Sequence, residues 1–326
     1  MFGVQAPAII AIALAFVEAV VAQGAAPRER IYFSVLNREH KPRLGLMEKD
    51  FVLRINGRPG VMEDFRPGKG NADCSRPLAA WILLESSRFV SSRVIADQAD
   101  AAAGLFDMLH PDSAVGVRLI TDRAETLAPL TRHRRDLREA FTRFGESRRE
   151  LKAVPRDETV FLGEDGMFRA IDIAITGLNN FRLSDPSLQG KEALSALIII
   201  AGASLSPWYD ERNLTAKAAR HAVFIYPILM PEATHGLWRR YSELAQSAAG
   251  ILSGFGALSP ELNSFKSRTM NLDRDALTFN FIQIVRDLNG KYSFLAPPVP
   301  PGGKVELELK CREKDVHIQL PRKRLP

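Results

Sequence analysis

Three unbroken apolar runs constrain what this chain can fold into. They lie at residues 81–84, 196–200 and 222–226, and helical patterns occupy much of the sequence between and after them. An unbroken apolar run suits a strand that is buried on both faces of a parallel sheet, because a half-exposed strand alternates. Buried strands that alternate with helices require right-handed crossovers. We therefore predict an α/β fold with a doubly wound, mostly parallel sheet over residues 78–255.

A small β module is predicted before this domain, at residues 28–66. Ile31, Phe33 and Val35 alternate with polar residues, and a second strand follows at 50–55. Asn56-Gly57 is a strong hairpin signal, so we expect residues 61–65 to pair back onto that strand. Residues 67–77 are rich in Gly, Pro, Asn and Asp and are interpreted as a linker.

The end of the chain, residues 256–326, is predicted to contain a helix and a β hairpin. The helix is expected at 273–288, and apolar residues alternate with charged ones over 305–311. Residues 316–320 show the same alternation and are expected to form the other half of the hairpin. The two β parts are expected to pack together beside the large sheet.

The first 22 residues are interpreted as a signal peptide. The apolar run at 8–17 is too short to span a membrane, and Val20-Val21-Ala22 forms an acceptable cleavage site. No Lys or Arg precedes the run, and Glu18 interrupts its end. The alternative is an apolar first helix of a cytosolic protein. We expect an exported protein, periplasmic or extracellular, without a transmembrane anchor.

The charge and the cysteine count exclude some functions. The net charge of +6 permits an anionic partner, but no zinc-ligand spacing or basic helix accompanies it, so nucleic acid binding is not expected. The chain has two cysteines, Cys74 and Cys311, which form one disulfide in an exported protein or remain two unrelated thiols. No structural zinc site is predicted.

Short motifs in a fixed order give the chain a family resemblance. An opening β unit, a second strand with its following helix, a Leu-Ala helix that ends at a glycine, and a closing β segment follow one another. They are carried by Gly45-Leu46, Asp50-Phe51, Asn56-Gly57, residues 115–141, Leu244-Ala245, Gly250, Tyr292 and Pro297. This order resembles the acidobacterial VWFA-related domain family of exported bacterial proteins, which contain a von Willebrand factor A-like (vWA-like) domain.

The resemblance implies a metal site, and this sequence departs from it. A vWA domain binds a divalent cation through Asp-x-Ser-x-Ser, a threonine and an aspartate from three loops at the carboxyl ends of the strands. Here Glu85 replaces the aspartate, Ser87 is kept and Phe89 replaces the second serine. The second loop offers Asp165 in place of the threonine, and residues 201–203 contain no carboxylate. Mg²⁺ tolerates poor geometry badly, so we expect no bound metal and no other cofactor.

The predicted function is therefore a metal-independent protein–protein interaction module rather than an enzyme, with an unknown protein partner. Arg88 and Arg169 are hypothesised to supply the positive charge that a metal would supply, unless both are ordinary solvated residues. The candidate partner-binding residues are Arg88, Phe89, Arg169, Ser204 and Trp208.

Three alternatives remain open at this point. A residual Mg²⁺ site would use Glu85, Ser87 and Asp165. A serine hydrolase would use Ser204 as nucleophile, with His221 or His235 as base. The arginine-rich residues 132–149 form either a solvated helix face or a contact for an anionic surface.

Overall fold

The computed structural model of the protein describes the strands, most of the helices and some of the connections. The described residues are 30–38, 41–69, 76–85, 104–120, 124–149, 166–188, 192–201, 211–229, 235–248, 250, 253–254, 272–299, 303–320 and 324–325. The predicted signal segment and Cys74 lie outside them. Cys311 is a free thiol in the structure.

The core of the fold is a six-stranded sheet with the order β6-β5-β4-β7-β8-β9. All neighbours pair in parallel except β5 and β6, which pair antiparallel at one edge. The chain moves outward from β4 to β6 and then returns to β7, so the strand order reverses beside β4. The strands are β4 (Leu78–Glu85), β5 (Ala114–Ile120), β6 (Ala124–Thr131), β7 (Leu194–Ala201), β8 (Val223–Leu229) and β9 (Ser253–Gly254). This is the predicted vWA-like, doubly wound topology.

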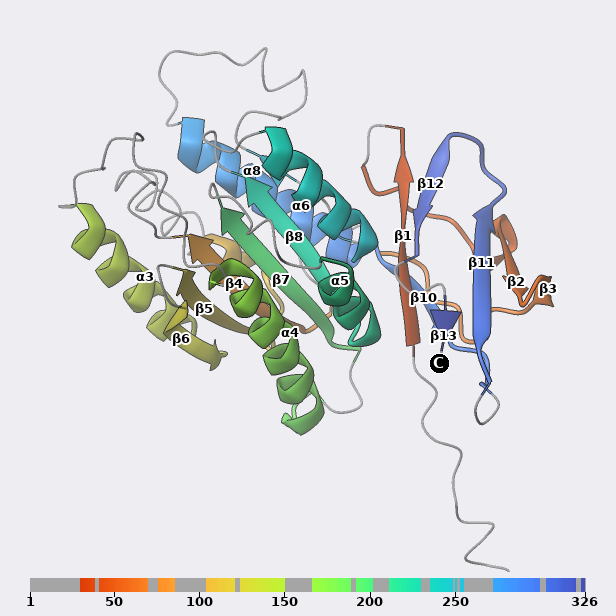
Figure 1. The fold of residues 1–326 in the computed structure, drawn as a ribbon, viewed down its shortest axis with the longest axis horizontal. Helices are drawn as coiled ribbons and strands as arrows, with labels where there is room; N and C mark the ends of the chain where they lie inside the picture. The colour runs from red at the N-terminus through yellow and green to blue at the C-terminus, as the bar shows by residue number, and fades with distance from the viewer. Residues whose placement is uncertain are drawn as a thin grey trace, which may run out of the picture.

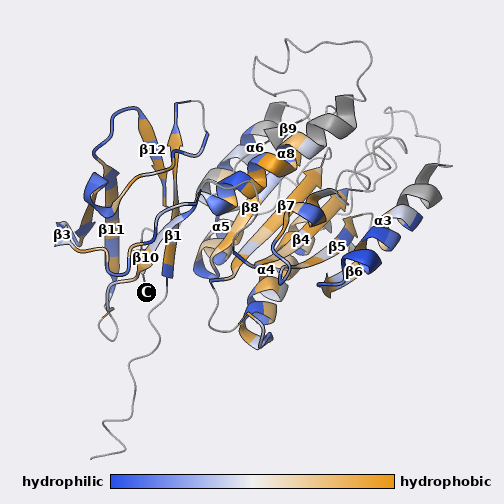
Figure 2. Ribbon diagram, turned by 180° about the vertical axis from the view of Figure 1, so that it is seen from behind, coloured by the Kyte–Doolittle hydropathy of each residue, from blue (hydrophilic) through white to orange (hydrophobic). Residues whose placement is uncertain are grey.

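Helices cover both faces of this sheet (Figure 1). One face packs against α3 (Arg134–Arg149) and α8 (Leu272–Asn289). The other packs against α4 (Gly166–Ser184), α5 (Glu211–Arg220) and α6 (His235–Ser247). Every residue of β4, β7 and β8 is buried, and the central strands are apolar along most of their length (Figure 2). The continuous apolar runs therefore reflect two-sided burial, as predicted.

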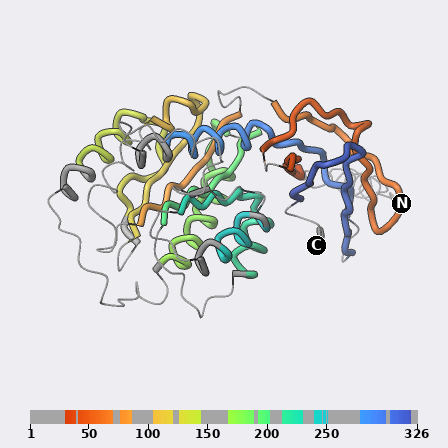
Figure 3. The backbone as a smooth tube through the Cα atoms, turned by 90° about the horizontal axis from the view of Figure 1, so that it is seen from above, coloured from red at the N-terminus to blue at the C-terminus, as the bar shows by residue number. Residues whose placement is uncertain are grey.

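The two ends of the chain build one β module together. β1 (Arg30–Asn37) pairs antiparallel with β10 (Tyr292–Leu295) and with β12 (Val316–Gln319). β2 (Phe51–Ile55) pairs with β11 (Val305–Cys311) and with β3 (Arg58–Gly60), and β13 (Arg324–Leu325) pairs with β11. A short 3-10 helix, Glu48–Asp50, leads into β2. Seen from above, the first and last strands gather at one end of the molecule (Figure 3).

Two sequence predictions within this module are wrong in detail. The strand that pairs back onto β2 is β3, not residues 61–65, because Asn56 and Gly57 both adopt positive φ and turn the chain in two residues. Val61 is 73% exposed. The two closing strands also do not pair as a hairpin: β11 bonds to β2, whereas β12 bonds to β1.

β1 connects the module to the α/β domain because both of its faces are buried. Ile31, Phe33 and Val35 enter the module core. Tyr32 instead packs in the core of the α/β domain, where its ring meets Phe224 of β8 edge to face at 6.1 Å. Alternation along one strand thus divides its side chains between two cores.

A buried polar network closes this junction. The Asp287 carboxylate of α8 accepts hydrogen bonds from Ser34 Oγ of β1 at 3.0 Å and from the Tyr226 hydroxyl of β8 at 2.7 Å. Lys291 Nζ lies 2.6 Å from the same carboxylate and also donates to Ser34. Lys291 is 0% exposed and Asp287 1%. Burial lowers the pKa of Lys291, and the Asp287 charge opposes that shift.

A second set of charged side chains lies at the same junction between the β module and the α/β domain, near the start of β7. The Glu192 carboxylate, just before β7, pairs with the guanidinium groups of Arg30, Arg66 and Arg76. Arg76 is itself buried and donates to the backbone oxygen of Lys291 at 3.1 Å. The junction charges are therefore paired across elements that are far apart in the sequence.

Among the described residues, no helix is both long enough and apolar enough to cross a bilayer.

Candidate functional site

The candidate site lies at the carboxyl edge of the large sheet. β4 ends at Glu85, beside Ile120 of β5, and β7 and β8 end together at Ala201 and Leu229. Each of α4, α5 and α6 precedes a parallel strand, so each begins near this edge and returns the chain to the opposite edge. Ligand sites in such sheets lie at this edge, where the strand order reverses.

Glu85 is buried beneath this edge. It is 1% exposed and shares a face of β4 with Leu83 and Trp81, the face that α4 and α6 cover. The Tyr241 side chain of α6, 0% exposed, lies in the same core. Burial raises the pKa of Tyr241 far above its usual value, the Glu85 charge raises it further, and Arg240 opposes the shift. The carboxylate and the phenol thus share a low-dielectric environment.

The Tyr241 hydroxyl is a buried polar group with an unsatisfied hydrogen-bonding capacity. It is shielded from solvent and has no hydrogen-bond partner among the described residues. Buried hydroxyl groups in native proteins usually form a hydrogen bond. A buried hydroxyl group without one therefore calls for a specific explanation, such as a ligand.

Arginines flank this buried pair. Arg169 is exposed in the first turn of α4, between the buried Phe168 and Ala170. The Arg240 guanidinium of α6 lies 5.8 Å from the centre of the Phe168 ring and so links α6 to the start of α4. Neither α4 nor α6 has an acidic residue in its first turn. Positive helix ends and arginines together favour a negatively charged partner at this edge.

Only part of the predicted site can be placed. Glu85 and Arg169 lie among the described residues and belong to the same edge, on β4 and α4. Ser87, Arg88, Phe89, Asp165, Ser204 and Trp208 lie outside the described residues. Sequence reasoning missed Arg240 and Tyr241, although their adjacency on a helix that follows a buried strand indicates that one faces the core and the other the rim.

The described residues contain only one of the predicted metal-ligand positions, Glu85. No cluster of three or more His, Cys, Asp or Glu side chains occurs there in an arrangement that could hold a metal ion. The one described ligand position, Glu85, is enclosed beside a phenol and not presented to solvent. No step of a metal-dependent binding mechanism is therefore assigned to these residues.

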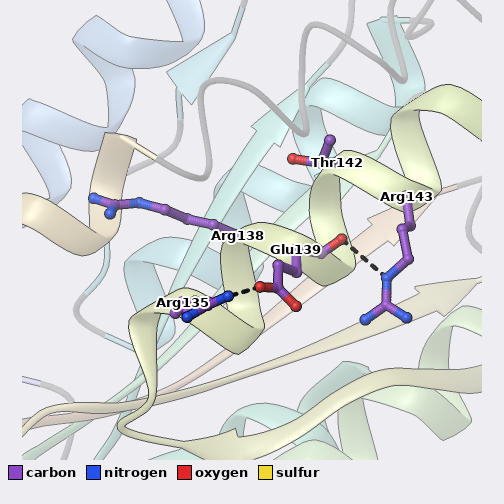
Figure 4. A pocket seen from close by; sticks show the side chains of 5 residues that line it. All are labelled: Arg135, Arg138, Glu139, Thr142 and Arg143. Carbon is purple, nitrogen blue, oxygen red and sulfur yellow. Dashed lines mark hydrogen bonds and ion pairs between the residues drawn. The ribbon is translucent and has the colours of Figure 1, made fainter.

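The arginine-rich segment forms a separate surface on α3. Leu137, Ala140 and Phe141 face the core, whereas Arg135 and Arg143 face solvent. An open pocket of about 640 Å³ lies on this helix (Figure 4), lined by Arg135, Arg138, Glu139, Thr142 and Arg143. Arg135 pairs with Glu139 at 2.8 Å, and Arg138 pairs with Asp107. Exposed ion pairs of this kind are typical of a helix face in contact with solvent.

The chain shares little sequence identity with the similar structures described here. No family model matches the sequence, and no curated protein matches it. A von Willebrand factor type A protein from Catenulispora acidiphila is 11% identical, with 93% of this chain and 74% of that chain covered and a TM-score of 0.43. Proximal thread matrix protein 1 from the mussel byssus is 14% identical, with 75% of this chain covered and a TM-score of 0.42.

A third similar structure is BatB from Bacteroides thetaiotaomicron, which is 14% identical. It covers 64% of this chain and 99% of its own length, with a TM-score of 0.40. The present chain spans about half, 49%, of the length of the byssal protein. The vWA-like assignment stands on the strand order and crossovers described above.

Proposed function

We propose that this protein is an exported, non-enzymatic interaction module that binds a partner protein at the carboxyl edge of its vWA-like domain without a metal ion. We further infer that it is a member of the VWFA-related family whose metal-binding loops have lost their function. The observation that carries the proposal is the burial of Glu85. A metal ion that is coordinated by both this protein and its partner must lie at the surface, where a carboxylate of the partner completes the coordination shell. The Glu85 side chain is enclosed and does not present a ligand there.

Positive charge from the chain itself takes the place of the metal in this proposal. Arg169 is exposed at the start of α4, and Arg240 lies against Phe168 on the neighbouring helix. A guanidinium donates two parallel hydrogen bonds to a carboxylate, which gives both attraction and orientation. The partner is therefore expected to present an acidic side chain.

The test is capture of the partner on immobilised protein from cell and culture-medium extracts of the source organism, with EDTA and with Mg²⁺. We expect the same bound protein in both buffers. Arg169→Glu is expected to weaken its binding by about tenfold or more, because the reversed charge repels the acidic group.

Arg58→Glu is the matched control, because Arg58 is also exposed but lies in β3 of the distant module. Capture that requires Mg²⁺, or that survives Arg169→Glu unchanged, would overturn the proposal. Recovery of the partner only from cytosolic extract would refute export alone.

A further inference from the structure

Arg118 and Trp81 form an unusual pair on the sheet face that α4 covers. Arg118 of β5 is in register with Leu83 of β4, and its guanidinium carbon lies 4.7 Å from the centre of the Trp81 ring. The indole lies across Gly116 of β5, where an added Cβ would be 2.4 Å from the ring. Trp81 is only 5% exposed, whereas Arg118 is partly exposed. The pair therefore extends from the core to the surface.

Both side chains carry a buried donor without an acceptor. Nε of Arg118 and Nε1 of Trp81 are shielded from solvent, and neither has a hydrogen-bond partner in the described part of the chain. Gly177 of α4 stands opposite the indole, where an added Cβ would lie 3.4 Å from Nε1. Because glycine has no side chain, space remains beside the indole N–H. Gly177 itself is partly exposed.

The positive charge of Arg118 is also uncompensated. No ion pair joins Arg118 to a carboxylate among the described residues, and burial alone lowers its pKa. Several other buried or partly buried arginines do form ion pairs: Arg30 and Arg76 with Glu192, and Arg132 with Asp185. A desolvated charge without a counterion is costly, and so is an unmet buried donor.

We propose that Arg118 and Trp81 form a carboxylate-binding site between β5 and α4. A carboxylate carries one negative charge, which matches the single guanidinium in a low-dielectric position, whereas a phosphate dianion would leave excess charge. Its two oxygens accept from Arg118 and from the indole N–H together. The site is distinct from the carboxyl edge and does not rest on the function proposed there.

The site is tested by the indole resonance and emission of Trp81 in a Trp208→Phe, Trp238→Phe background. Acetate and succinate are titrated against chloride at equal ionic strength, followed by the peptide N-acetyl-Gly-Glu-Gly-amide. We expect a saturable downfield shift of the indole N–H and a matching change in emission.

Two variants separate binding from structure. Gly177→Ala places a methyl beside Nε1 at an ordinary contact distance, so the protein should fold normally and bind carboxylates at least severalfold more weakly. Arg118→Gln should abolish binding, whereas Arg54→Gln, at an exposed position of β2, should not.

The outcomes distinguish the source of the carboxylate. Saturable binding of acetate or succinate indicates a small-molecule ligand, and binding of the peptide alone indicates an acidic side chain. Both support the site. An indole signal that is unaffected by all three probes, or a response that Gly177→Ala leaves unchanged, would overturn the proposal and indicate that water satisfies the two donors.

Discussion

Two buried carboxylates of this molecule each lie beside a buried tyrosine, and the two tyrosines differ in their hydrogen bonding. Asp287 at the junction and Glu85 at the carboxyl edge are both 1% exposed. Asp287 receives hydrogen bonds from a serine of β1, a tyrosine of β8 and a lysine in the link between α8 and β10. The tyrosine near Glu85, Tyr241, leaves its hydroxyl without a partner. The tyrosine beside Asp287 is therefore bonded, whereas the tyrosine beside Glu85 has no bonding partner among the described residues.

The difference separates the junction, which is structural, from the carboxyl edge, which is the proposed binding site. A fully bonded polar network fixes the relative position of the elements that contribute to it, and here it joins the β module to the α/β domain. Unmet polar groups do not add stability, and in native proteins each of them calls for a specific explanation. The carboxyl edge and the Arg118–Trp81 pair both contain such groups, which also occur at Ser195, Asn280 and Gln319.

The largest effect is expected from breaking the junction network with Lys291→Met. The variant leaves Asp287 buried without its counterion, which costs about 3–5 kcal/mol. Urea unfolding of the variant and the wild type measures the change. Lys304→Met is the control, since Lys304 is exposed in the same module. A loss below about 1 kcal/mol would mean that the junction does not depend on this pair.

The same substitution in both regions tests the comparison directly. Tyr226→Phe removes a donor to a buried charged carboxylate, so it is expected to cost about 1.5–3 kcal/mol. Tyr241→Phe removes a hydroxyl that has no partner, so stability should change by less than about 0.5 kcal/mol or increase. Urea unfolding measures both variants. Equal losses of unfolding free energy would contradict the distinction between a hydrogen-bonded tyrosine and one without a partner.

The smallest effect concerns a paired charge at the amino edge of the sheet. Burial acts to raise the pKa of Asp185, but hydrogen bonds from Arg132 and Ser187 outweigh it, so the pKa lies below the usual value of 3.8. A carboxyl whose folded pKa is lowered adds stability above its unfolded pKa and loses that contribution as the pH falls through the folded pKa. Arg132→Gln should therefore weaken the acid-induced loss of stability between pH 5 and pH 3.

A parallel experiment checks this pH dependence. Urea midpoints of the wild type and Arg132→Gln should differ at pH 5 and converge toward pH 3. A constant difference over that interval would show that Arg132 acts by packing on Phe181, which its guanidinium approaches at 5.7 Å.

The fold was largely predictable because burial on two faces leaves a clear sequence pattern. Residues 81–84 and 196–200 are apolar without interruption, and both lie within fully buried strands. The turn at Asn56-Gly57 was equally clear, although its tightness shifted the returning strand to β3. Local chemistry determines such features.

The junction was not predictable from the same patterns. Ser34 and Asp287 are 253 residues apart in sequence, and no local pattern indicates that they meet. The spacing of Asp287 and Lys291 is that of an ordinary exposed helical pair, so its burial is a tertiary effect. Glu85 was identified as a site position, but glutamates are seldom fully buried, and its enclosure by the α6 side of the core was not expected.

The most direct test of metal independence is thermal unfolding of the protein with EDTA and with millimolar Mg²⁺ or Mn²⁺. A ligand that binds only the native state raises its stability by mass action. We expect the same Tm in all three buffers, for the wild type and for Glu85→Ala alike. A rise of several degrees with Mg²⁺ or Mn²⁺ that Glu85→Ala removes would show that the carboxyl edge holds a metal and would contradict the proposed function.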